Sequence, residues 1–161
     1  MTYSIDRRSL LGLLLASAAM PLTGCGSPAD AKTFPVSYPE DEWRRRLTPA
    51  QFAILRQEAT EAPFTSRLLT EHREGTFVCA ADSNPLFASA TKYDSGTGWP
   101  SFWKPLPGAI GTSTDYKLGY ARTEVHCARC GGHLGHVFDD GPRPTGLRYC
   151  MNGDALAFRP A

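Results

Sequence analysis

Cys150 lies in a segment whose neighbouring side chains suit nucleophilic sulfur chemistry. Arg148, Cys150 and Asn152 alternate along a predicted strand, so all three belong to one face. A guanidinium beside a thiol favours the thiolate, which is the nucleophile, and an amide can donate hydrogen bonds. Two of the four histidines, His133 and His136, lie just upstream. This set predicts a catalytic cysteine, and the alternative is a buried structural cysteine beside surface histidines.

A second group of cysteines has the spacing of a metal site. Cys127 and Cys130 are three residues apart and are followed by two glycines, which allow the tight turn that brings both sulfurs onto one tetrahedral ion. Cys79 and Asp82 repeat this spacing with a carboxylate in place of the second thiolate. We expect these four residues to bind a structural zinc ion, with no organic cofactor. His126 as a substitute ligand, a metal-free site, and a Cys127–Cys130 disulfide remain alternatives.

The first residues have the pattern of an export signal. Arg7 and Arg8 precede an apolar stretch that is too short and too interrupted to be a good membrane span. The two arginines resemble a twin-arginine signal, and residues 22–25 resemble a bacterial lipoprotein box that ends at Cys25. We therefore expect a signal peptide over 1–24, a lipidated tether over 25–37 and a folded domain over 38–161. The protein would then be lipid-anchored on the periplasmic side of the envelope, unless the signal is a plain one and Cys25 is incidental.

Composition and turn signals predict the framework that must position these residues. The chain has 161 residues, 15 Gly, 13 Pro and a net charge of +1, which favours short strands over a helix bundle and gives no reason to expect a nucleic-acid partner. A short charged helix is predicted near 38–46. Thr48 and Gln51 form a capping box that begins a second helix, with Phe52, Leu55 and Ala59 on its buried face.

After residue 71 the pattern changes to short apolar runs between turns, which is typical of a mainly β domain with antiparallel strands. The predicted strands cover 76–79, 86–89, 109–111, 120–125, 133–138, 147–150 and 155–158.

Four longer motifs make the sequence recognisable, at 94–102, 122–125, 133–142 and 146–152. In this order they closely resemble the B-type methionine sulfoxide reductases, over 38–158. The resemblance implies two antiparallel β-sheets with peripheral N-terminal helices. It also implies reduction of methionine (R)-sulfoxide in proteins and peptides, by a monomer that depends on a thioredoxin-like or other thiol reductant.

The resemblance also assigns roles by position. Cys150 would attack the sulfoxide and become a sulfenic acid. Arg148 would help to hold the thiolate, and Trp99 and Phe138 would bind the substrate. The roles of orienting the substrate and protonating the departing oxygen would fall to three residues: His133, His136 and Asn152.

The sequence departs from the family at Thr97, where many relatives have a resolving cysteine. An external thiol must then reduce Cys150 directly, unless zinc is absent and Cys79 acts as a substitute. Two other functions stay open, namely an inactive zinc-ribbon-like binding module on the same fold and a Cys-His-Asn hydrolase. The hydrolase lacks an obvious oxyanion-hole motif near Cys150.

Overall fold

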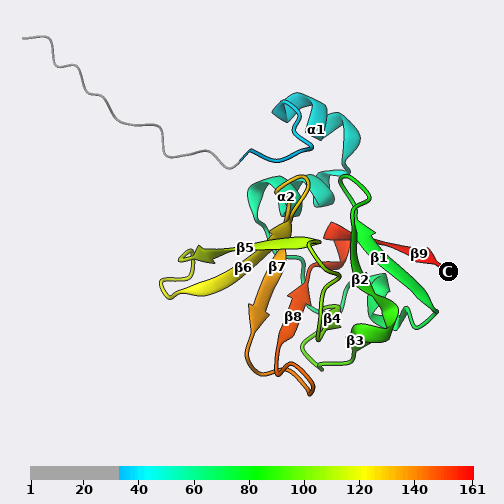
Figure 1. Cartoon of the computed structure of the whole chain (residues 1–161). Coiled ribbons are helices and arrows are strands. Elements are labelled where there is room, and N and C mark those ends of the chain that lie inside the picture. The colour runs from blue at the N-terminus through cyan, green and yellow to red at the C-terminus, as the bar shows by residue number, and fades with distance from the viewer. Residues whose placement is uncertain (1–32) are drawn as a thin grey trace, which may run out of the picture. The chain divides into compact units, whose positions relative to one another are not determined.

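The computed structural model describes residues 33–161, so the predicted signal peptide and Cys25 lie outside the described residues. Two short helices precede two antiparallel β-sheets, and three 3-10 turns connect parts of the chain (Figure 1). Within this described range, no helix is long and apolar enough to cross a membrane. The mainly β architecture predicted from the sequence is confirmed.

Both predicted helices are present. The helix α1 (Glu40–Arg46) has acidic residues in its first turn and basic residues in its last, and these charges stabilise the helix by interacting favourably with its dipole. Its one buried side chain is Trp43. The helix α2 (Pro49–Gln57) begins with the predicted capping box of Thr48 and Gln51. It ends earlier than its apolar pattern, because Glu58 adopts a left-handed conformation, and Ala59 packs against the core from beyond the helix.

The smaller sheet has three strands in the order β2-β1-β9, and the larger has six in the order β3-β4-β8-β7-β6-β5. The three strands are β1 (Gly75–Cys79), β2 (Pro85–Ala88) and β9 (Leu156–Pro160). The six are β3 (Lys92–Tyr93), β4 (Ser101–Phe102), β5 (Ile110–Asp115), β6 (Arg122–Cys127), β7 (His133–Phe138) and β8 (Arg148–Met151). The 3-10 turns are η1 (Arg67–Thr70), η2 (Ser89–Thr91) and η3 (Gly153–Ala155).

Aromatic side chains join the two sheets. Phe102 on β4 stacks on Phe87 of β2 with ring centroids 4.3 Å apart, and Phe77 of β1 meets Phe102 edge-on at 4.9 Å. All three side chains are fully buried. Such aromatic pairs add about 0.5–1.5 kcal/mol each beyond the area that they bury. This core fixes β4, and β4 pairs directly with β8, the strand that carries Cys150.

The strands β7 and β8 lie in the middle of the larger sheet and bring the predicted catalytic residues together. His136 is paired with Cys150, and Gly135 with the fully buried Met151. A side chain at Gly135 would start only 2.1 Å from the carbonyl oxygen of Cys150, so the close approach of the strands requires glycine there.

The described end of the predicted tether contacts the domain. The Val36 N–H donates to the carbonyl of Arg129 at 2.9 Å, and the Phe34 ring lies edge-on to His126 at 5.7 Å. Residues 33–37 therefore pack beside the turn that holds Cys127 and Cys130.

Candidate active site

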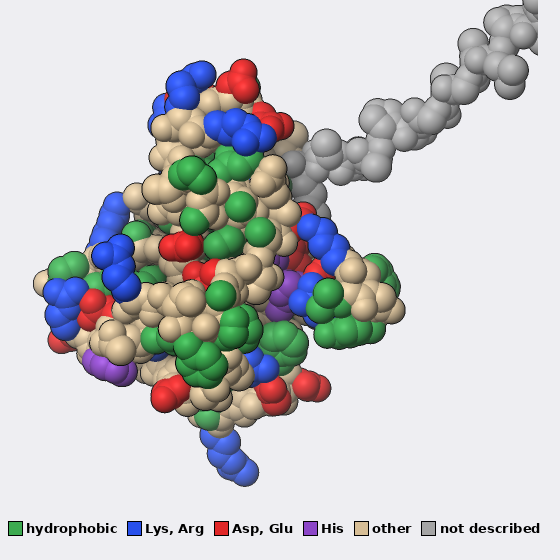
Figure 2. Space-filling view, turned by 180° about the vertical axis from the view of Figure 1, so that it is seen from behind, with side chains coloured by type: hydrophobic (Ala, Val, Ile, Leu, Met, Phe, Trp, Pro, Cys, Tyr) green, Lys and Arg blue, Asp and Glu red, His purple; other side chains and the backbone are tan. Residues whose placement is uncertain are grey.

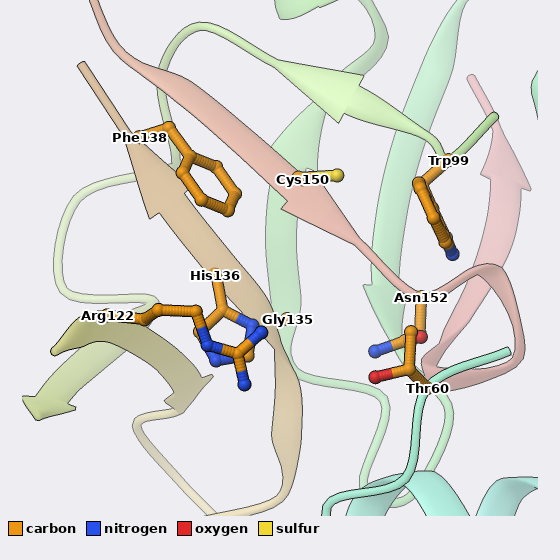
Figure 3. A pocket seen from close by; sticks show the side chains of 8 residues that line it. All are labelled: Thr60, Trp99, Arg122, Gly135, His136, Phe138, Cys150 and Asn152. Atoms are coloured by element: carbon orange, nitrogen blue, oxygen red, sulfur yellow. The ribbon is translucent and has the colours of Figure 1, made fainter. Parts of the chain in front are cut away.

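A small pocket surrounds the Cys150 thiol. Its volume is about 120 Å³, and β8 presents Cys150 between Trp99 on one side and Phe138 on the other (Figure 3). His136 and Asn152 line the same pocket. The structure thus brings together five of the residues predicted from the sequence. His133 and Arg148 are not part of the pocket wall, which instead includes Thr60, Arg122 and Gly135.

The environment of Cys150 differs from the expected thiolate-favouring one. Burial raises the pKa of the Cys150 thiol, while a hydrogen bond from Thr97 and the charge of Arg148 act in the opposite direction. The two nitrogens Nε and Nη2 of Arg148 each donate to Asp140 at 2.8 Å, so its charge is shared with that carboxylate. The resting state is therefore a thiol. The Thr97 hydroxyl oxygen lies 3.9 Å from the Cys150 sulfur.

Glu61 holds two walls of the pocket in place. Its backbone N–H donates to the Asn152 side-chain oxygen at 3.0 Å, and its carbonyl accepts from the Trp99 indole at 3.2 Å. Its carboxylate accepts from the backbone N–H groups of Gly153 at 2.6 Å and Asp154 at 3.0 Å. Burial raises the pKa of Glu61, which these two hydrogen bonds oppose. Sequence reasoning missed Glu61, because it lies in a loop without periodicity.

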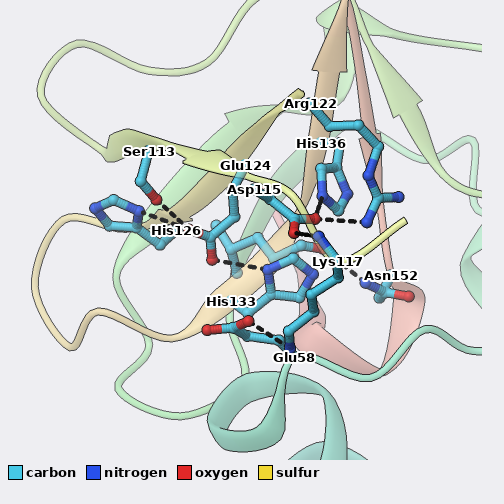
Figure 4. A network of polar contacts seen from close by, with 11 residues as sticks. Glu58, Ser113, Asp115, Lys117, Arg122, Glu124, His126, His133, His136 and Asn152 are labelled. Atoms are coloured by element: carbon cyan, nitrogen blue, oxygen red, sulfur yellow. Dashed lines mark hydrogen bonds and ion pairs between the residues drawn. The ribbon is translucent and has the colours of Figure 1, made fainter. Parts of the chain in front are cut away.

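Two carboxylates, one on β5 and one on β6, hold the two histidines of β7 (Figure 4). Asp115 of β5 contacts His136 Nε2 at 2.8 Å and also pairs with Arg122. A hydrogen bond from the Lys117 backbone, followed by the one from His136, holds the pKa of Asp115 at about 2. Burial lowers the pKa of His136, so this imidazole is neutral at pH 7 and its Nε2–H donates to Asp115.

Glu124 of β6 contacts the other histidine, His133. Its Oε1 lies 2.8 Å from His133 Nδ1, and Ser113 donates to its other oxygen. The pKa of Glu124 is lowered by its contacts with His126 and His133. His133 is 3% exposed, and its other ring nitrogen has no hydrogen-bond partner among residues 33–161. Neither Asp115 nor Glu124 was predicted from the sequence as a site residue. These two polar residues alternate with other residues along neighbouring strands. This pattern identifies their partners only when the strand register is known.

The predicted metal ligands form a separate cluster. One ligand atom from each of Cys79, Asp82, Cys127 and Cys130 lies within 4.8 Å of the others. The Cys79 and Cys130 sulfurs are 3.8 Å apart, and the Cys127 sulfur is 3.6 and 3.7 Å from the two Asp82 oxygens. A tetrahedral zinc ion with Zn–S near 2.3 Å and Zn–O near 2.1 Å separates two sulfurs by ~3.8 Å and a sulfur from an oxygen by ~3.6 Å. The donor set therefore fits zinc.

Surrounding groups support thiolates in this cluster. Arg56 donates to the Cys130 sulfur at 3.3 Å and Asn84 to the Cys127 sulfur at 3.4 Å, as outer partners of metal ligands do. The cysteines of the described residues are free, so the alternative Cys127–Cys130 disulfide is not found. His126 is not in the cluster, and Cys79 has no solvent exposure. Cys79 and Cys150 belong to different sheets, which gives no support to Cys79 as a resolving cysteine.

Comparisons with known proteins agree with this arrangement. The SelR domain family model matches residues 47–160. The peptide methionine sulfoxide reductase MsrB of Leptospira interrogans is 51% identical over 127 residues, which is 78% of this chain and 97% of that protein. The MsrB of Leifsonia xyli is 54% identical over 129 residues, 79% of this chain and 93% of that protein. The methionine-R-sulfoxide reductase B3 of Mus musculus is 41% identical over 166 residues, covering 99% of this chain and 65% of its own length.

Proposed function

The chain belongs to the SelR family of peptide methionine sulfoxide reductases, and we propose from this premise how its own residues reduce methionine (R)-sulfoxide. The enzyme is a peptide-methionine (R)-S-oxide reductase that uses a thiol as reductant. The observation that carries the proposal is the position of the Cys150 thiol in a pocket with two aromatic walls, an imidazole and an amide. Trp99 and Phe138 provide an apolar surface for the S-methyl group, and the Asn152 amide donates a hydrogen bond to the sulfoxide oxygen.

Cys150 acts as the nucleophile. Its sulfur attacks the sulfoxide sulfur, the sulfur–oxygen bond breaks, and the oxygen is retained on Cys150 as a sulfenic acid. One thiol and one sulfoxide give one sulfenic acid and one thioether, so the sulfoxide gains two electrons and Cys150 loses two. The thiol proton is transferred to the departing oxygen. The unprotonated Nδ1 of His136 accepts the thiol proton and passes it to the departing oxygen, while the Asn152 amide donates a hydrogen bond to that oxygen, since both residues line the pocket.

His133 and Arg148 act through their neighbours. His133 is buried, and its ring centroid lies 5.3 Å from that of His136, so it positions that imidazole. Arg148 lowers the pKa of Cys150 against the effect of burial and so increases the thiolate fraction.

An external thiol regenerates the enzyme directly. Attack of one thiol on the sulfenic acid releases water and forms a mixed disulfide, which a second thiol reduces. Thr97 faces Cys150 but cannot form a disulfide. The other described cysteines lie in the metal cluster. A thioredoxin-like protein is the proposed reductant.

Zinc in the Cys79, Asp82, Cys127 and Cys130 cluster is the proposed structural cofactor, supported by its donor spacing. The ion would connect the β1–β2 turn to the turn after β6. Metal analysis of the purified enzyme should give about one zinc per chain, and a value near zero would reject this assignment.

We also propose that the enzyme is exported and repairs oxidised envelope proteins as a lipid-anchored monomer. The support is the sequence pattern of Arg7–Arg8 and of residues 22–25, with 1–24 as signal, 25–37 as lipidated tether and 38–161 as the enzyme domain. Fractionation of cells that express the full chain or Cys25→Ser tests the anchor. The full chain should sediment with membranes and the variant should be released, and equal distribution would refute lipidation.

A stereospecific assay tests the activity. With dithiothreitol as reductant, the enzyme should reduce peptides that contain methionine (R)-sulfoxide and not the S epimer. Cys150→Ser should abolish turnover while the fold, followed by circular dichroism, is retained. Turnover of neither epimer by the wild type would instead favour the inactive binding module.

A further inference from the structure

The catalytic pocket is too small for more than one side chain. Its volume of about 120 Å³ is well below the roughly 300–1,000 Å³ of sites that enclose whole small ligands. When a methionine sulfoxide side chain fills it, the polypeptide that carries the side chain must lie across the pocket mouth. The surface on both sides of the mouth then contacts the neighbouring residues of the substrate.

Two surface hollows continue from the walls of this pocket. One, of about 420 Å³, shares Arg122 and Phe138 with the pocket and is also lined by Tyr120 and Leu147. The other, of about 230 Å³, shares Trp99 and is also lined by Phe64 and Leu69. Phe138 and Trp99 stand on opposite sides of Cys150 (Figure 3), so the hollows flank the pocket on its two sides.

Large apolar side chains are exposed beside both hollows. Phe64 is 70% exposed and Tyr120 is 59% exposed, although each could lower its free energy by burial. Figure 2 shows further apolar side chains at the outer end of the β5–β6 hairpin, but Tyr116 and Leu118, which are exposed on this hairpin, line neither hollow. Exposed aromatic side chains beside a pocket indicate a binding surface more than scattered ones do.

We propose that the two hollows are subsites for the residues on either side of methionine sulfoxide, and that they favour substrates with apolar flanking residues. The occupant is an extended polypeptide segment, whose residues each span about 3.3–3.6 Å, so that immediate neighbours of the sulfoxide reach the two shared walls. Tyr120 and Phe64 are the residues that select the apolar flanks. The inference rests on the proposed function, since it assumes that methionine sulfoxide occupies the Cys150 pocket.

Three substrates with (R)-sulfoxide test the subsites: a blocked tripeptide with leucine on both sides, the same peptide with aspartate on both sides, and N-acetyl-methionine sulfoxide. For the wild type we expect kcat/KM to be about tenfold higher for the leucine peptide than for the aspartate peptide, equivalent to about 1.4 kcal/mol. Equal values for the two peptides would overturn the proposal. No turnover of any of the three substrates would refute the proposed function, and the subsites with it.

Single substitutions test whether Tyr120 and Phe64 cause the preference for apolar flanking residues. Tyr120→Ser and Phe64→Ser should each lower kcat/KM for the leucine peptide severalfold and leave N-acetyl-methionine sulfoxide unchanged. Leu118→Ser is the matched control, because Leu118 is as exposed as Tyr120 and lies on the same hairpin but lines neither hollow. Peptides with leucine on one side only should respond to one variant each. An equal loss on all substrates, a loss in Leu118→Ser, or a response of both variants to the same side would overturn the two-subsite proposal.

Discussion

Removal of the Glu61 carboxylate should impair catalysis without changing the nucleophile. In Glu61→Ala the backbone N–H groups of Gly153 and Asp154 both lose their acceptor. Asp154 is exposed and can bond to water, whereas Gly153 is buried. A buried N–H without a partner costs about 1–3 kcal/mol, so the free energy of unfolding should fall by that amount.

Loss of the carboxylate should also affect the pocket. The carboxylate anchors Glu61, and the backbone of Glu61 holds the side chains of Trp99 and Asn152. If the whole cost appears in the transition state, kcat/KM falls by about 5- to 150-fold. The alkylation rate of Cys150 by iodoacetamide should stay at the wild-type value, because no Glu61 atom contacts the thiol within the described hydrogen bonds. Glu61→Gln keeps one acceptor oxygen and should recover part of the activity.

Glu58→Ala is the matched control. Glu58 lies three residues earlier and pairs with Lys117 across the surface, where both side chains are about half exposed, so the loss should be under about 1 kcal/mol. Its kcat/KM should be that of the wild type. Glu61→Ala with lower stability and full activity would refute the positioning role. An equal fall in turnover and in alkylation rate would indicate general distortion of the site instead.

Four further outcomes are expected. Because burial raises the pKa of Cys150, the alkylation rate of this thiol should increase with pH above neutrality. Arg148→Met should move the increase to higher pH, because the guanidinium lowers this pKa. An unchanged pH profile would contradict the role of the guanidinium. Thr97→Cys should form a disulfide with Cys150 after one turnover, detected as a loss of two thiols, since the two side-chain atoms are 3.9 Å apart in the wild type. Asp82→Ala should lower the zinc content and the Tm, while Asp82→Cys should raise the affinity for zinc, measured by competition with a chelator. Phe102→Ala should reduce the free energy of unfolding by about 3–5 kcal/mol in urea titrations, whereas the exposed Phe64→Ala should change it by less than about 0.5 kcal/mol.

The features that were predicted from the sequence depend on residues close together along the chain. The capping box at Thr48, the cysteine spacing at Cys127 and Cys130, and the strand that carries Cys150 each depend on neighbours within a few positions. The long motifs also assigned Trp99 and Phe138 to the pocket, which the structure places there.

Contacts that depend on register were not predictable. Asp115 reaches His136 across two strand pairings, and Glu61 reaches Asn152 and Gly153 over more than 90 residues of chain. The balance of effects on the pKa of Cys150 was not predictable for a related reason. The sequence shows Arg148 nearby, which lowers this pKa, but only the fold shows that Asp140 shares the charge of Arg148 and that burial outweighs its effect.

The burial of Met151 protects this side chain from oxidation. Met151 is the only methionine after residue 20, and its side chain is fully buried beside the strand of Gly135. An oxidant that reaches the described surface finds no thioether there to convert to a sulfoxide. Residues 33–161 therefore offer no exposed methionine as a substrate to other copies of the enzyme.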